Sequence, residues 1–253
     1  MSILLIDIGN TRLKWALLAP HGELGEQFAI AHGNWHSDTW RQTFDSMESR
    51  PSRILVSNVA GSRAEQALRA AASERWQLDI ELQTSVRAAA GVRNGYAEPQ
   101  QLGVDRWLGV IAAHRSEQRT ACVASIGTAM TIDAVTGEGQ HLGGLIVPGP
   151  RLMIDSLLRG TSDIAARAQE REIAADGFAD HTFAAIVQGS RLACAALIER
   201  SVRTLAAHEQ QQPSLILTGG AADEVRSHID LPCRVVPDLV LRGLAVLAGE
   251  TER

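Results

Sequence analysis

The sequence predicts an α/β protein made of two similar halves, each with a mixed β-sheet flanked by helices. Residues 4–18 have the pattern of an apolar strand, a polar turn at Gly9-Asn10 and a second apolar strand. Residues 122–135 repeat this order, with the turn at Gly127. Short apolar runs then alternate with helical patterns in both halves, which is typical of mixed α/β folds. An internal repeat of this kind constrains the whole architecture.

The turn of the first hairpin has the residue types of a phosphate site. Gly9 lets the backbone approach a ligand closely, and Asn10 and Thr11 can donate hydrogen bonds to phosphate oxygens. Asp7 ends the first strand, where a carboxylate can hold a hydrated magnesium ion beside those phosphates. An ordinary surface hairpin with an aspartate at its end has the same pattern, so this stretch alone leaves both interpretations open.

The repeat favours the phosphate interpretation. When the two hairpins are aligned, Ile8-Gly9 falls on Ile126-Gly127, and Asp7 falls on Ser125. Two phosphate hairpins in two similar halves are typical of the actin, Hsp70 and sugar-kinase superfamily, which clamps ATP between its halves.

Composition narrows the class of protein. The 253 residues fit two modest domains, and 45% hydrophobic with 21% charged residues is ordinary for a globular protein. A net charge of −5 provides no broad attraction for nucleic acid or an anionic membrane, so we expect neither as a partner.

The cysteines and the apolar runs indicate in which cellular compartment the protein is expected. The three cysteines are far apart and form no CxxC pair, which argues against a disulfide framework or a zinc site. Asp7 interrupts the first apolar run, so we expect no signal peptide. No apolar run reaches the roughly 18 residues of a membrane span. We therefore expect a cytoplasmic protein.

In the first half, Ser62 is expected to cap a helix that runs to about Trp76, with Glu65 in the capping-box position. Another helix begins near Leu102, so residues 103–106 are expected at a helix N-terminus, where the macrodipole favours anions. Asp and Arg at that position are also compatible with a helix start and a solvated charge. The remaining expected elements are a strand at 26–31, a polar helix at 37–49 and a buried strand at 53–59.

In the second half, paired glycines at Gly143-Gly144 precede a buried strand that Pro148-Gly149-Pro150 ends. Gly219-Gly220 follows a strand at 214–218, as either a nucleotide-contacting turn or a tight connection. Helices are expected at 151–159, 182–208 and 239–249, with a loop at 161–180. No linker is evident, and we expect a division into residues 1–117 and 118–253.

Five segments, in this order, resemble the type III pantothenate kinase family, also known as the Bvg accessory factor family. The resemblance spans nearly the whole chain. The segments are Asp7-Ile8-Gly9-Asn10-Thr11, Gly103-Val104-Asp105-Arg106, Ile126-Gly127-Thr128-Ala129-Met130-Thr131-Ile132-Asp133, Gly143-Gly144-Leu145-Ile146-Val147-Pro148-Gly149 and Thr218-Gly219-Gly220-Ala221.

The resemblance implies a homodimer with a duplicated actin-like fold that phosphorylates pantothenate with ATP, the first step of coenzyme A biosynthesis. Asp105 matches the family's proton acceptor, and Asp7 would orient Mg²⁺. The implied ATP contacts are Asp7, Ile8, Gly9, Asn10, Thr11, Arg12, Leu13, Lys14 and Thr128. The implied pantothenate contacts are Tyr96, Gly103, Val104, Asp105, Arg106 and Thr182.

The sequence departs from the family at Ser125. The family commonly carries an aspartate there, and that carboxylate binds a monovalent cation. The potassium or ammonium site therefore lacks its usual carboxylate in this chain.

Two other functions compete with the kinase. A nucleotide-sensing regulator would use the same clamp, but it would not need a base such as Asp105. A polyphosphate or nucleotide phosphohydrolase would need a basic groove, of which the net charge gives no sign. No GxxxxGK[ST] segment is present, which excludes a P-loop enzyme, and the glycines at 137–143 do not fit GxGxxG.

Overall fold

The computed structural model of the chain describes residues 2–31, 40, 43, 44, 47, 50–160 and 178–250. The chain divides into two compact units. The first contains Met1–Gln118, Gly137–Leu142 and Asp238–Arg253, and the second contains Arg119–Thr136 and Gly143–Pro237. The helix expected at 37–49 and the loop expected at 161–180 lie outside the described residues, apart from positions 40, 43, 44, 47 and 178–180.

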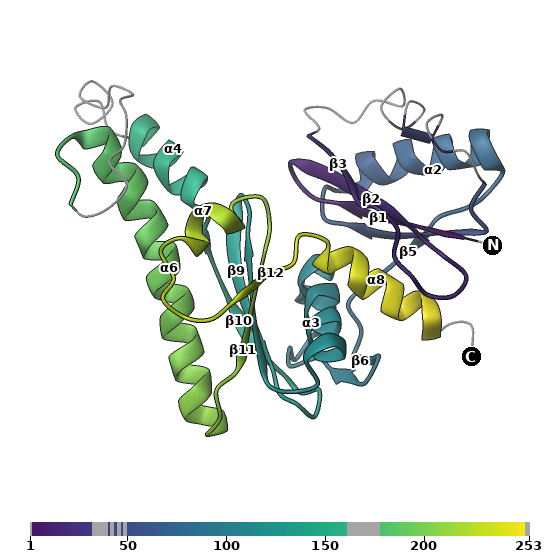
Figure 1. Cartoon of the computed structure of the whole chain (residues 1–253). Coiled ribbons are helices and arrows are strands. Elements are labelled where there is room, and N and C mark those ends of the chain that lie inside the picture. Colours follow the sequence, from purple (N-terminus) through teal and green to yellow (C-terminus); the bar gives the residue numbers. More distant parts are fainter. Residues whose placement is uncertain are drawn as a thin grey trace. The chain divides into compact units, whose positions relative to one another are not determined.

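The first unit is a five-stranded sheet with the order β3-β2-β1-β4-β5, covered by helices (Figure 1). β1 pairs antiparallel with β2 and parallel with β4. Its elements are β1 (Ile3–Ile8), β2 (Arg12–Leu18), β3 (Phe28–Ala31), β4 (Arg53–Asn58), α2 (Ser62–Trp76), β5 (Glu81–Leu82), the small hairpin β6 (Ala88–Ala89) and β7 (Val92–Arg93), the 3₁₀ turn η1 (Pro99–Gln101), α3 (Val104–Glu117) and α8 (Leu239–Glu250).

The second unit repeats this topology, with the strand order β10-β9-β8-β11-β12. β8 pairs antiparallel with β9 and parallel with β11, as β1 does with β2 and β4. Its elements are β8 (Ala121–Ile126), β9 (Ala129–Val135), β10 (His141–Pro148, which begins in residues of the first unit), α4 (Pro150–Gly160), α6 (Thr182–Glu209), β11 (Ser214–Thr218), α7 (Ala222–Arg226) and β12 (Arg234–Val235). The duplication predicted from the two hairpins is confirmed.

The two hairpins differ in the length of their turns. Ile8 pairs with Leu13, so residues 9–12 form the first turn, whereas Ile126 pairs with Met130, so residues 127–129 form the second. The second turn is therefore one residue shorter, although the strands on either side correspond.

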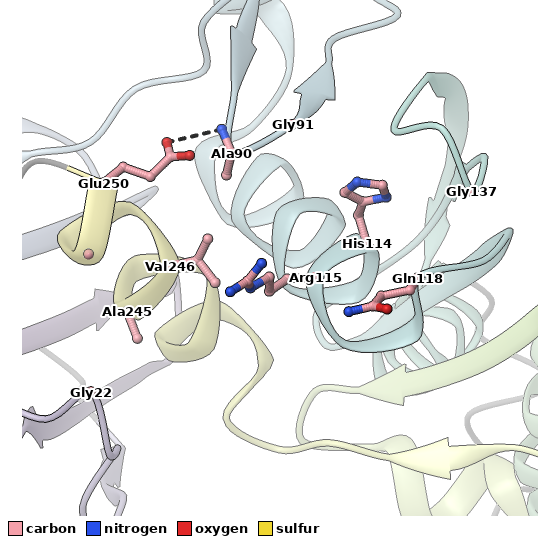
Figure 2. Close-up of a pocket in the computed structure, with 11 residues that line it drawn as sticks. Gly22, Ala90, Gly91, His114, Arg115, Gln118, Gly137, Ala245, Val246 and Glu250 are labelled. Carbon is pink, nitrogen blue, oxygen red and sulfur yellow. Dashed lines mark hydrogen bonds between the residues drawn. The ribbon is translucent and has the colours of Figure 1, made fainter. Parts of the chain in front are cut away.

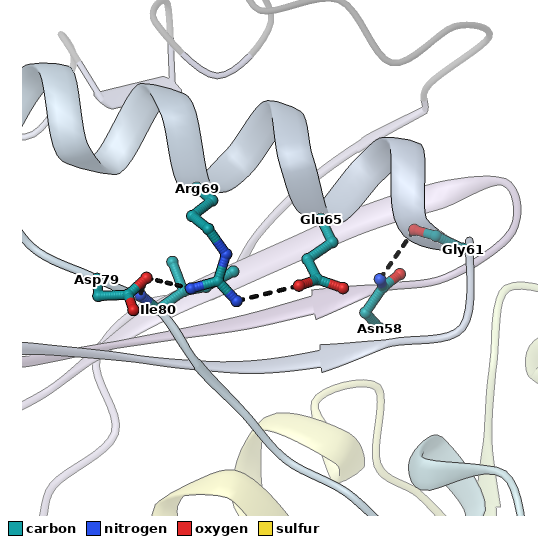
Figure 3. Close-up of polar contacts among 6 residues, drawn as sticks. All are labelled: Asn58, Gly61, Glu65, Arg69, Asp79 and Ile80. Atoms are coloured by element: carbon teal, nitrogen blue, oxygen red, sulfur yellow. Dashed lines mark hydrogen bonds and ion pairs between the residues drawn. The ribbon is translucent and has the colours of Figure 1, made fainter.

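The start of α2 differs from the expected capping box. Gly61 is the N-cap, with φ of 90° and no side-chain cap, and Ser62 is the first helical residue. The Asn58 side chain donates to the Gly61 carbonyl at 3.0 Å, and Glu65 forms an ion pair with Arg69 at 3.0 Å (Figure 3). The positive φ of Gly61 sets the entry to the helix, and Glu65 is engaged one turn further on.

The C-terminal helix α8 belongs to the first unit. Its Leu241 and Leu244 are fully buried in a cluster that includes Leu108 of α3 and Leu5 of β1. This grouping differs from the expected single division after residue 117, because the apolar face of α8 covers the first sheet. Long-range packing of this kind leaves no local signal in the sequence.

The long helix α6 is the one described helix that is long and apolar enough to cross a membrane. However, Cys194, Ile198 and Val202 lie in the buried core of the second unit, packed with β8 and β11. A core helix of a globular unit has the same length and composition, so this finding is weak support for a membrane span.

Gly243 brings α8 and α3 into close contact. A Cβ at this position would lie 2.3 Å from the Leu108 carbonyl oxygen, whereas a Cβ at Gly249 of the same helix would meet nothing within 4 Å. We predict that Gly243→Ala lowers the free energy of unfolding by about 1–3 kcal/mol, because the helices must move apart. The matched Gly249→Ala should be neutral or stabilising by up to about 1 kcal/mol. Urea denaturation measures both, and equal effects would contradict the close packing.

Candidate active site

The sheet of the first unit places Asp7 on the side of α3 and α8. Because successive strand residues point to opposite faces, Ile6 and Ile8 pack with α2, whereas Leu5 packs with α3 and α8. Asp7 follows the alternation of Leu5 and lies at the end of β1, where apolar packing stops. The strand pattern therefore buries a carboxylate at the C-terminal end of the central strand, and Asp7 is only 8% exposed.

Three polar residues surround this carboxylate. Lys14 on β2 and Ser57 on β4 are its neighbours in strand register. Burial raises the pKa of Asp7 to about 6, Lys14 partly offsets this shift, and Asp105 at the start of α3 adds to it. Burial also lowers the pKa of Lys14, although the charge of Asp7 opposes that shift. Asp7, Lys14 and Asp105 thus form one interacting group.

Two buried oxygen atoms, one on Asp7 and one on its neighbour Ser57, lack hydrogen bonds among the described residues. Asp7 Oδ1 and Ser57 Oγ have no hydrogen-bond partner among the described residues, although Ser57 is near enough to lower the pKa of Asp7. An unsatisfied buried carboxylate oxygen is costly unless a ligand or cation meets it. No group of three or more acidic, histidine or cysteine residues that could hold a metal is found in the described ranges. The buried Asp7 Oδ1 without a hydrogen bond fits Mg²⁺, which needs only one or two carboxylates when phosphates and water complete its shell.

Asp105 and Arg106 lie at the N-terminus of α3, as the sequence predicts, with Gly103 as the N-cap. The Asp105 Oδ1 atom accepts from the backbone N–H of Arg106 at 2.9 Å. A Cβ at Gly103 would lie 2.7 Å from that oxygen, so a larger residue would push the carboxylate aside. The glycine therefore leaves room for the carboxylate in this orientation.

Arg106 is directed toward Tyr96. Its Nη1 donates to the Tyr96 hydroxyl at 3.0 Å, and its Cζ lies 5.6 Å from the centre of the tyrosine ring. Arg106 is 8% exposed and Tyr96 is half-buried. The structure thus brings together two of the residues matched to pantothenate contacts.

In the second unit, two glycines hold the turn of the second hairpin. The Gly149 N–H donates to the Thr128 carbonyl at 2.9 Å, and a Cβ on Gly149 would lie 2.0 Å from the Gly127 carbonyl oxygen. Gly219, with φ of 95°, leaves no room for a Cβ beside the Ile126 backbone. Close backbone approach accounts for both glycine motifs, and Thr128 remains exposed at the turn.

The other predicted residues differ in their burial and in their place in the fold. Ile8 and Leu13 are fully buried in the core beside α2, so only their main chain can reach a ligand. The Gly9 N–H donates to the Arg12 carbonyl at 3.0 Å and closes the first turn. Thr182 is the first residue of α6 and lies in the second unit with Thr128. Asn10 and Thr11 are exposed, and Val104 is half-buried at the start of α3.

His141 contacts a predicted site residue, and the sequence analysis did not identify it. It is fully buried, and its ring stacks on Tyr96 with centroids 6.0 Å apart and an interplanar angle of 13°. The sequence offers only a polar residue in front of Gly143-Gly144, which is a weak signal.

A separate hollow of about 680 Å³ lies at the opposite end of α3 (Figure 2). It is lined by His114, Arg115 and Gln118 of α3, by the end of α8 around Val246 and by the turn at Gly91. Asp105 and Arg115 are about 15 Å apart along the helix axis, at 1.5 Å per residue. None of the predicted site residues lines this hollow.

The duplicated mixed sheet with flanking helices defines the fold shared by actin-like ATPases and sugar kinases. The activator of the 2-hydroxyisocaproyl-CoA dehydratase from Clostridium difficile, solved with bound ADPNP, shares this fold with a TM-score of 0.58 at 14% identity, covering 100% of this chain and 96% of that one. A Baf family transcriptional activator from Campylobacter jejuni has a TM-score of 0.59 at 21% identity, covering 98% of both chains.

The chain belongs to the type III pantothenate kinase family. The family's sequence pattern matches residues 3–204. The type III pantothenate kinase of Herminiimonas arsenicoxydans is 39% identical and that of Paraburkholderia phytofirmans is 38% identical. The alignments cover 98% of this chain in both cases, and 98% and 95% of the two relatives.

The raised pKa of Asp7 predicts how stability changes with pH. The folded chain binds the Asp7 proton more tightly than the unfolded chain does, because the pKa rises from 3.8 to about 6. Wild-type stability is therefore lost relative to Asp7→Asn as pH rises from about 4 through 6, by up to about 3 kcal/mol. Urea denaturation at several pH values measures the difference, with the exposed Asp223→Asn as control. A difference that does not vary with pH would contradict the buried carboxylate.

Proposed function

We propose that this chain catalyses the ATP-dependent phosphorylation of pantothenate to 4'-phosphopantothenate, the first step of coenzyme A biosynthesis. Membership of the type III pantothenate kinase family supports this substrate and reaction. The structural observation that carries the proposal is the buried Asp7 carboxylate, one oxygen of which has no hydrogen bond among the described residues, together with the Asp105 carboxylate that the Arg106 N–H orients. Phosphoryl transfer needs a base for the acceptor hydroxyl and a place for Mg²⁺ and phosphate.

In this proposal the hydroxyl oxygen of pantothenate attacks the γ-phosphorus of ATP and ADP leaves. Asp105 accepts the proton of that hydroxyl. Asp105 is half-buried, so its carboxylate can meet a substrate. The N–H of Arg106 holds Oδ1 at 2.9 Å, and the room left by Gly103 maintains this orientation. A base must lie within hydrogen-bond reach of the proton that it removes, so a fixed carboxylate favours the reaction.

Arg106 and Tyr96 are proposed to hold polar groups of pantothenate next to Asp105. The 3.0 Å bond from Arg106 Nη1 to the Tyr96 hydroxyl places a guanidinium, which favours anionic groups, beside the tyrosine. Val104 and Thr182 are also proposed as pantothenate contacts, because they match the family's substrate contacts.

Residues 7–14, which comprise the first turn and the adjoining ends of β1 and β2, are proposed to contact ATP together with Thr128. Asp7 would hold Mg²⁺, which would supply charge neutralisation at the phosphates. Lys14 lies opposite Asp7 on β2, and we propose that its positive charge also acts on these phosphates. The exposed side chains of Asn10, Thr11 and Thr128 supply polar groups at the two turns.

A nucleotide-sensing regulator is the second candidate, suggested by the name of the Campylobacter jejuni structure. A sensor needs the ATP contacts but no base at the acceptor. The oriented carboxylate of Asp105 favours the kinase.

We predict that the chain releases ADP from ATP only when pantothenate is present, and that Asp105→Asn lowers turnover by about 10²–10⁴-fold. The amide is nearly isosteric with the carboxylate, so the fold should be retained. A coupled ADP-release assay measures the rates, with the exposed Asp223→Asn as matched control. Turnover of Asp105→Asn within threefold of wild type would contradict its role as the base.

Ser125 sets the expected cation dependence. Its partners in strand register are Thr131 and Thr218, whereas the corresponding residue Asp7 has Lys14 and Ser57. Three neutral hydroxyl residues bring oxygen but no charge to a monovalent cation. The second unit therefore lacks a charged group at the position that corresponds to Asp7.

We predict that the wild-type initial rate varies little with potassium or ammonium, and that Ser125→Asp introduces dependence on them. The measurement is rate against potassium concentration at constant ionic strength, balanced with a bulky organic cation. Ser125→Ala should behave like wild type. A steep rise of the wild-type rate with potassium would mean that other oxygens complete a cation site.

We propose that the chain forms a homodimer through the second unit and works in the cytoplasm. Leu152 and Leu157 of α4 and Leu192 of α6 are exposed large apolar residues, and α4 packs against α6. Exposed large apolar side chains on adjacent helices are typical of an interaction surface.

Light scattering tests the dimer. We expect a particle of twice the 27.2 kDa chain mass. Leu152→Glu should shift it toward the monomer, because a charge would be buried at the interface. The equally exposed Val86→Glu in the first unit should not. A wild-type particle of one chain mass at working concentration would contradict the proposal.

A further inference from the structure

The main chain around Tyr96 is held firmly. Asn94 Oδ1 accepts from the Tyr96 N–H at 2.9 Å, and Asn94 Nδ2 donates to the Val86 carbonyl at 3.3 Å. Arg87 donates to the carbonyls of Tyr96 and Ala97 at 3.2 and 2.8 Å. These bonds fix where the tyrosine leaves the loop, but they do not fix the rotation of its side chain.

The ring of Tyr96 is oriented by two residues from other segments. Arg106 donates to its hydroxyl at 3.0 Å, and His141 stacks on the ring at 6.0 Å between centroids. His141 is fully buried, and its Nδ1 accepts from the Gly95 N–H at 3.3 Å. The histidine therefore contacts both the ring and the main chain of the loop.

The positions of these groups separate their roles. Tyr96 is half-buried and can meet a substrate, whereas His141 has no exposed surface. His141 belongs to a segment of the first unit that precedes Gly143, and Arg106 belongs to α3. The Tyr96 ring thus contacts two segments that are distant in the sequence, the one that contains His141 and the start of α3 at Arg106.

We propose that His141 is a positioning residue of the acceptor site, which orients the ring of Tyr96 and, through its hydroxyl, the guanidinium of Arg106. This inference rests on the proposed function. The histidine takes no part in proton transfer. Loss of its ring lets Tyr96 rotate and displaces the hydroxyl that accepts from Arg106 Nη1, so pantothenate binds less well while the base Asp105 is unaffected.

Steady-state kinetics test this role. His141→Leu should raise the KM for pantothenate by about threefold to tenfold, the range expected for loss of an aromatic pair. The kcat and the KM for ATP should change less than twofold. His141→Phe, which keeps a stacked ring, should restore most of the loss. His114→Leu is the matched control, because that histidine is in the same unit and lines the separate hollow.

A double-mutant cycle separates positioning from a general loss of structure. If His141 acts through Tyr96, the KM effect of His141→Leu disappears when Tyr96 is already alanine. The inference is overturned if the effect persists in the Tyr96→Ala background, or if kcat falls as much as KM rises. It is also overturned if His141→Leu, shown by its melting temperature to be folded, keeps the wild-type KM.

The same assay distinguishes failure of the inference from failure of the proposed function. A wild-type chain without pantothenate-dependent ADP release would overturn the proposed function, and the inference with it. An active wild type with an unaffected His141→Leu variant would overturn the inference alone.

Discussion

A carboxylate buried at the end of an apolar strand is the constraint on which the candidate site depends. Folding of β1 removes Asp7 from water because the rest of the strand is core, and burial raises its pKa to about 6. Lys14 reduces this penalty and Asp105 increases it. One Asp7 oxygen remains without a hydrogen bond among the described residues. Burial of this carboxylate therefore has an electrostatic cost that a bound cation would reduce.

The duplicated sheet shows how the two units differ in chemistry. Strand pairing places Ser125, Thr131 and Thr218 of the second unit where the first has Asp7, Lys14 and Ser57. The titratable groups of this position are thus confined to the first unit. The second unit supplies a shorter turn, packed against Gly149 and Gly219. The two units therefore share the same strand pairing, but only the first has charged side chains at this position.

The sequence predicted the features that depend on local pattern. Apolar alternation and a Gly-polar turn predicted both hairpins, and the helical period after Leu102 predicted that Asp105 lies at a helix N-terminus. The capping box at Ser62 was wrong because Gly61 sets the entry to the helix. The return of α8 to the first unit and the stacking of His141 on Tyr96 depend on contacts between distant residues. No spacing in a single sequence reports such contacts.

The central claim is that Asp7 and Asp105 divide the work of one phosphoryl-transfer site, the first holding the metal and the second acting as base. Isothermal titration of ATP into the Asp7→Asn and Asp105→Asn variants, with and without Mg²⁺, tests this division directly. We expect Asp105→Asn to bind ATP with the wild-type gain in affinity from Mg²⁺, and Asp7→Asn to lose most of that gain. An undiminished gain in Asp7→Asn, or its loss in Asp105→Asn, would contradict the account.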